Sequence, residues 1–218
     1  MLIPHDPIRE TLHALTRSAV YGMFAALLAP PADAQSLANP FEQAHNLAGT
    51  VSARLPFAWS TSSLLSAVAV ARRLDPAELL RRRAAALADG PGGKGLALAA
   101  TQADDAPADS RLAWTFGPSG VVRQPDLPAG HLVHLLRLLR RLAEREADAD
   151  TPAERSGQRI AQVDAIDRHL GPRVRALAGV AAVRAGVCPF AGVLVALEQW
   201  LTRDRRWLGG ATGVTVPG

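Results

Sequence analysis

The six histidines are the side chains of this chain best suited to binding a metal or moving a proton. They are His5, His13, His45, His131, His134 and His169. No two are four residues apart, the spacing that would place two imidazoles on one helical face for zinc. His131 and His134 are three residues apart. The helical periodicity predicts that His134 lies on a polar face with Arg137 and Arg141, whereas His131 precedes an apolar stripe, so the two imidazoles would point apart. The sequence therefore predicts no metal site.

The remaining nucleophiles and acids are isolated from one another. Cys188 is the only cysteine, which excludes an intramolecular disulfide or a CxxC zinc site and fits a reducing cytoplasm. Because it lies between Val187 and Pro189, we expect a small buried side chain rather than a reactive thiolate. Glu144 and Glu146 are two residues apart and point away from each other on a helix. We therefore expect no catalytic residues, no bound cofactor and no enzymatic activity.

The positive charge is spread over the chain rather than gathered. The formal net charge is +4, and Lys94 is the only lysine. The arginines occur in short pairs and one triplet, without the basic tract interleaved with aromatics that nucleic-acid binding favours. We expect no nucleic-acid partner. A helical DNA-binding regulator is the alternative, with residues 75–89 as its recognition helix, but the segment before them lacks a polar, glycine-containing short turn.

Composition indicates which elements position these residues. Hydrophobic residues make up 48% of the chain and aromatic residues only 5%, which favours helices packed through Leu, Ala and Val. We predict a single all-α domain over residues 1–218, a bundle of about eight to ten helices. No run reaches the roughly 18 apolar residues of a spanning helix, so we expect no stable membrane insertion.

Local signals place the helices. An apolar stripe of Ile8, Leu12, Leu15, Ala19, Met23 and Leu27 predicts a helix over residues 8–28 with that stripe in the core. Asp75 and Thr151 are predicted N-caps, the latter in a capping box with Glu154. Further helices are expected over residues 61–74, 75–89, 132–146, 151–170, 174–185 and 190–208. Irregular structure is expected over residues 41–56, a short extended turn at 114–123, a flexible loop near 89–95 and a disordered tail from about 209.

Three short motifs carry a resemblance to a known family. They are Arg17-x-x-x-Tyr21, the segment Leu127-Pro128-Ala129-Gly130-His131-Leu132, and His169-Leu170-x-Pro172. In this order they resemble the TorD-like chaperones, which include the DmsD and NarJ groups. That family has a Pro-x-Asp-His loop before a central amphipathic helix. Here Gly130 stands where the aspartate is expected.

The resemblance implies a cytoplasmic chaperone, monomeric or homodimeric, without a cofactor of its own. Such proteins bind the twin-arginine signal peptide and the apoprotein of the catalytic subunit of a molybdopterin enzyme of the dimethyl-sulfoxide-reductase type. They hold this client back from export until its cofactor is inserted.

A binder of such a peptide needs an apolar groove with acceptors at one end. The Leu stripe of residues 132–142 would form the groove, and the acidic patch of residues 144–150 would supply the charge. The predicted binding residues are Leu127, Pro128, Gly130, His131, Leu132, Leu135, Trp114, Tyr21, Glu144 and Glu146. The stripe could equally be ordinary core and the acids a solvated helix end, and the sequence leaves both interpretations open.

Overall fold

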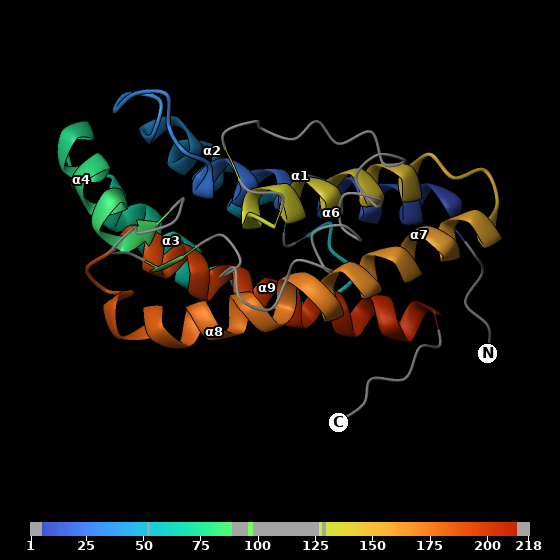
Figure 1. Cartoon of the computed structure of the whole chain (residues 1–218). Helices are drawn as coiled ribbons and strands as arrows, with labels where there is room; N and C mark the ends of the chain where they lie inside the picture. Colours follow the sequence, from blue (N-terminus) through green and yellow to red (C-terminus); the bar gives the residue numbers. More distant parts are fainter. Residues whose placement is uncertain (1–5, 52, 89–95, 98–126, 128–129, 213–218) are drawn as a thin grey trace.

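The structure, a computed structural model, describes residues 6–51, 53–88, 96–97, 127 and 130–212 (Figure 1). Its α-helices are α1 (Pro7–Leu28), α2 (Ala38–Val51), α3 (Ser62–Ala71), α4 (Pro76–Ala86), α6 (Leu132–Ala147), α7 (Pro152–Ala165), α8 (Gly171–Ala181) and α9 (Pro189–Thr212). A π-helical turn, η1 (Ile166–Leu170), and a 3₁₀ turn, η2 (Ala182–Arg184), adjoin α8. The two-residue strands β1 (Leu87–Ala88) and β2 (Leu96–Ala97) pair in parallel. The all-helical class predicted from the sequence is confirmed.

One continuous helical segment explains why the described part contains seven rods rather than the predicted eight to ten. Helices α7 and α8 run into each other through η1, so they form a single rod. Pro172 looked like the first residue of a separate helix. It lacks the N–H that an α-helix interior requires, and the π turn accommodates it, with the Gly171 N–H donating to the Ile166 carbonyl. A Cβ on Gly171 would lie 2.9 Å from that carbonyl oxygen.

The ends of several helices differ from the predictions. Helix α2 covers residues 38–51 and so includes 41–51 of the stretch 41–56 that was expected to be irregular; its face of Phe41, Ala44 and Ala48 is buried. Helix α4 stops at Ala86 because the chain becomes extended at Leu87. Helix α9 continues past Gly209, which is itself buried, so the predicted tail begins too early. The predicted loop at 89–95 and the predicted turn at 114–123 lie outside the described residues.

Helix α1 presents a different face to the core from the one its apolar periodicity indicated. Met23 and Leu27 are buried as predicted, but Ile8, Leu12, Leu15 and Ala19 face solvent. The buried face of the first four turns is instead built from Ala14, Arg17, Ser18, Val20 and Tyr21. The prediction is therefore wrong for the first half of the stripe, because polar groups on the opposite face of α1 bind polar groups of other helices and are buried with them.

Two long helices, α6 and α9, organise the bundle. Helix α1 lies antiparallel along α6, as the proximity of Ser18 to Glu144 and of Gly22 to Arg140 shows. The other side of the core is α9, which packs against α3, α7 and α8 (Figure 1) and buries Trp200 completely. None of the helices in the described ranges is both long enough and apolar enough to cross a membrane.

Gly192 permits the close approach of α3 and α9. A Cβ added at Gly192 would lie 2.9 Å from the Cβ of Ala67, so we expect Gly192→Ala to destabilise the fold by about 1–3 kcal/mol through overpacking. Gly157→Ala on α7 is the matched control, since nothing lies within 4 Å of its added Cβ and alanine favours helix by up to about 1 kcal/mol. Urea unfolding of both variants measures the difference. Equal stabilisation of the two would contradict this packing.

Candidate functional site

Arg17 is a charged side chain with no exposed surface, and its guanidinium is held by three helices other than its own. Its Nε lies 2.5 Å from Oδ1 of Asp204 on α9, and its Nη1 lies 2.7 Å from Oε2 of Glu146 on α6. Its Nη2 donates to the side-chain oxygen of Gln162 on α7. All three partners are fully buried. Arg17 therefore joins four helices at one point.

Further groups complete this buried polar cluster. Tyr21, one turn after Arg17, donates its hydroxyl to Asp204. Arg159 on α7 lies 2.6 Å from Glu146, and the Gln162 amide donates to the same carboxylate at 2.9 Å. The Trp207 ring lies against both arginines, 4.9 Å from the Arg17 guanidinium and 5.0 Å from that of Arg159. Each buried charge thus has an opposite charge beside it.

The electrostatics keep this cluster ionised. Burial by itself would raise the pKa of Glu146, but the nearby charges of Arg17 and Arg159 outweigh it and hold that pKa below the usual value. Burial would lower the pKa of Arg17, yet Asp204 and Glu146 raise it above its usual value. Burial and the adjacent Asp204 charge raise the pKa of Tyr21, which remains a neutral donor. These pKa directions favour the charged forms of Arg17 and Glu146 and the neutral form of Tyr21.

Two of the predicted binding residues, Tyr21 and Glu146, belong to this cluster. Neither exposes any surface, and the hydrogen bonds above account for their polar atoms. Their environment is that of groups that hold helices together. Glu144, the other predicted acid, lies at the surface with its side chain 25% exposed, where Arg140 and Arg141 bind its carboxylate.

The loop before α6 is also packed into the protein. His131 is the N-cap of α6, and its Nδ1 accepts a hydrogen bond from the Val133 N–H at 3.2 Å. His131, Leu132 and Leu135 are buried, as is Leu127 at 9% exposure. The predicted residues Pro128 and Trp114 lie outside the described part of the chain. The residues expected to line a groove therefore face the core.

His134 occupies the core rather than the polar face predicted for it. It is fully buried, and its ring centroid lies 6.4 Å from that of His131. The prediction is wrong because α6 is covered by α1 on one side and by α7 on another, which leaves only a narrow solvent-facing strip at Arg137, Arg140 and Arg141. Within the described ranges, no group of three or more metal-ligating side chains comes together.

Two of the motifs that suggested a family meet in space. Arg173, which follows the His169-to-Pro172 segment, donates a hydrogen bond to the backbone carbonyl of Gly130. These residues are 43 positions apart in the sequence. The hydrogen bond ties the start of α8 to the loop that precedes α6. Both motifs therefore contribute to one junction of the bundle.

One surface suited to binding a partner is the outward face of the first half of α1. Ile8, Leu12 and Leu15 are 73%, 48% and 46% exposed, and their spacing of four and three residues places them in one row. Three large aliphatic side chains in a row on the surface are more than the scattered single residues expected of an ordinary surface. We call these three residues the α1 stripe.

Two carboxylates lie at the same end of the bundle as the α1 stripe. Asp148 and Asp150, in the turn between α6 and α7, are exposed, and neither forms an ion pair with another described residue. Arg155 links this turn to α1, because it binds the Glu10 carboxylate at 3.0 Å and the Ala149 carbonyl at 3.0 Å. Figure 1 shows the turn beside the N-terminal end of α1. An exposed apolar row and two exposed acids, without an ion pair in the described ranges, thus lie at one end of the bundle.

The sequence analysis missed the α1 stripe as a surface. One feature of the sequence indicated that the opposite face could be buried: Glu10, Arg17 and Tyr21 lie off the apolar row and have acids and arginines as possible partners elsewhere in the chain.

Comparison with known protein families, with curated proteins and with solved structures finds no match for this chain.

Glu146 provides a test of the buried cluster. We expect Glu146→Gln to cost about 3–5 kcal/mol, because it leaves the Arg17 charge undercompensated in the interior. The variant should also lose less of its free energy of unfolding than the wild type when the pH is lowered. As the pH drops below the ordinary pKa of 4.5, the unfolded carboxylate takes up a proton before the native one, so wild-type stability declines there. Chemical unfolding at pH 7 and at pH 4 measures both effects.

Glu144→Gln is the matched control for this test. It removes a carboxylate from the same helix, but one that is partly exposed, so we expect a loss below about 1 kcal/mol. Equal small losses for the two variants would contradict the cluster's role.

Proposed function

We propose that this chain is a binding protein of the TorD-like chaperone type. Its client is the catalytic subunit of a molybdopterin-dependent oxidoreductase of the dimethyl-sulfoxide-reductase type, whose twin-arginine signal peptide it holds in the cytoplasm before export. The proposal rests on one observation above all: the α1 stripe is exposed at the same end of the bundle as the exposed carboxylates of Asp148 and Asp150.

The chemistry of the two partners is complementary. A twin-arginine signal peptide has two arginines followed by an apolar segment, which needs an apolar surface with acceptors at one end. Ile8, Leu12 and Leu15, spaced by four and three residues, supply one exposed apolar row for that segment. Asp148 and Asp150 supply carboxylates, which guanidinium groups bind through bidentate hydrogen bonds.

This proposal moves the client site away from the residues that the sequence favoured. Leu127, His131, Leu132 and Leu135 are buried, so they support α6 rather than contact a peptide directly. Within the acidic patch of residues 144–150, the carboxylates proposed to bind the peptide arginines are Asp148 and Asp150. Glu144 binds arginines of its own helix, and Glu146 is buried. The absence of the family's aspartate at Gly130 fits a loop whose contact with Arg173 uses a backbone carbonyl.

The family resemblance gains support from where its motifs lie. Arg17 and Tyr21 both bind Asp204, and the two later motifs meet through Arg173. Residues that fix helix contacts are the ones a divergent relative would retain while its client surface changed.

The alternative, a DNA-binding regulator, finds less support in α4. A recognition helix needs free basic side chains, but the three arginines of α4 are engaged. Arg81 and Arg82 pair with Glu78. Arg83 is 4% exposed and donates to the Leu28 carbonyl at 3.1 Å.

Calorimetric titration with synthetic twin-arginine signal peptides tests the proposal. We expect saturable binding by the wild type. The double variant Leu12→Ser/Leu15→Ser and the double variant Asp148→Asn/Asp150→Asn should each weaken it by about tenfold or more, the scale of losing an interface anchor. Replacing the two peptide arginines with glutamine should weaken binding as much, and should have little further effect on the aspartate variant.

Val183→Ser is the control, since Val183 is 91% exposed and lies in η2, which follows α8, and not on α1. It should change affinity by less than about twofold, within the usual range for a residue outside an interface. Absence of binding to every peptide, or an equal loss in Val183→Ser, would overturn the proposal.

A further inference from the structure

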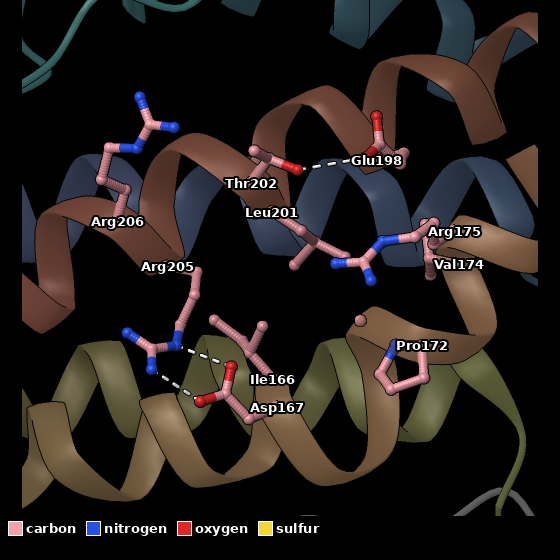
Figure 2. Close-up of a pocket in the computed structure, with 11 residues that line it drawn as sticks. Ile166, Asp167, Pro172, Val174, Arg175, Glu198, Leu201, Thr202, Arg205 and Arg206 are labelled. Carbon is pink, nitrogen blue, oxygen red and sulfur yellow. Dashed lines mark hydrogen bonds and ion pairs between the residues drawn. The ribbon is translucent and has the colours of Figure 1, made fainter. Parts of the chain in front are cut away.

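A cavity of about 630 Å³ lies between the η1–α8 segment and α9 (Figure 2). Its volume is that of a small-molecule site. None of its residues belongs to the α1 stripe or to the acidic turn. The residues that line it are Ile166, Asp167, Gly171, Pro172, Val174, Arg175, Glu198, Leu201, Thr202, Arg205 and Arg206.

The π turn gives this cavity its floor. The extra residue of a π turn interrupts the regular helix, and such turns occur often at functional sites. Here Gly171 and Pro172 place no long side chain at the bend. The aliphatic residues Ile166, Val174 and Leu201 form the packed wall behind it, each at most 3% exposed, and the exposed Pro172 ring adds apolar surface.

The two acids in the cavity are already engaged. Arg205 binds Asp167 through two hydrogen bonds of 2.6 and 2.7 Å. Glu198 accepts a hydrogen bond from the Thr202 hydroxyl at 3.1 Å. These contacts are drawn in Figure 2. Both oxygens of Asp167 therefore have a donor from Arg205, and one oxygen of Glu198 has a donor from Thr202.

The arginines that line the cavity, in contrast, have guanidinium N–H groups that bind no other residue in the described ranges. Arg175 and Arg206 are exposed, and neither forms an ion pair with another residue in the described ranges. Arg205 is 8% exposed, and its Nη1 is buried without a hydrogen-bond partner. Figure 2 shows the Arg175 guanidinium extending from α8 toward Leu201 above the aliphatic floor. Three arginines and two acids line the cavity, so its formal charge is positive.

We propose that this cavity binds a small organic anion with an apolar body. The hydrocarbon part lies against Pro172 and the edges of Ile166 and Leu201, and the carboxylate or phosphate head group is bound by Arg175. A guanidinium fork fits both head groups. The site is separate from the client surface, because its free cations repel the arginines of a signal peptide.

Titration of the full chain with octanoate, octyl phosphate and octylammonium tests this inference. We expect one saturable site for at least one anion, and octylammonium should bind about tenfold more weakly or not at all, since it meets the arginines with like charge. The tighter of the two anions identifies the head group. Competition with a twin-arginine peptide should be absent, so this result is independent of the chaperone proposal.

Arg175→Gln should weaken binding of the anion by about fivefold or more, the size of one charge-assisted contact. Arg203→Gln is the matched control, because Arg203 is an exposed arginine of α9 that does not line the cavity. It should change the affinity by less than about twofold, and both variants should keep the wild-type melting temperature. No saturable binding of either anion, equal binding of octylammonium, or equal losses in the two variants would overturn the inference.

Discussion

A guanidinium without exposed surface must find its counter-charges inside the protein, and Arg17 finds them in Glu146 and Asp204. Removing such a charge from water costs several kcal/mol, which close ion pairs and further hydrogen bonds offset only when their geometry is good. The partners come from α6 and α9, while Gln162 adds α7. The position of four helices therefore depends on one side chain, and a shift of any of them would leave a buried charge uncompensated.

The same contact sets the rotation of α1 about its axis. Since Arg17 and Tyr21 both turn inward to Asp204, the opposite side of the first turns faces solvent. Ile8, Leu12 and Leu15 are exposed as a consequence. The buried ion pairs and the exposed apolar row are thus two sides of one helix. In the account proposed here, the cluster maintains the fold and the row binds the client.

Local patterns predicted what local physics decides. The Leu stripe of α6 lies in the core, and the caps at Asp75 and Thr151 form the predicted hydrogen bonds. The buried face of α1 was not predictable in this way, because it depends on carboxylates 129 and 187 residues away. His134 was misplaced because one-dimensional periodicity does not reveal a helix covered on two sides. The α8–α9 cavity needed the π turn, which a proline alone does not specify.

Photocrosslinking tests the central claim, that the α1 stripe is the client surface, most directly. A benzophenone side chain replaces Leu12 in one variant and Val183, an exposed valine of η2, in another. Each is irradiated with a twin-arginine signal peptide. The account predicts a crosslink from position 12 that excess unlabelled peptide abolishes, and none from position 183. Equal crosslinking from both positions, or none from position 12 while the peptide is bound, would contradict it.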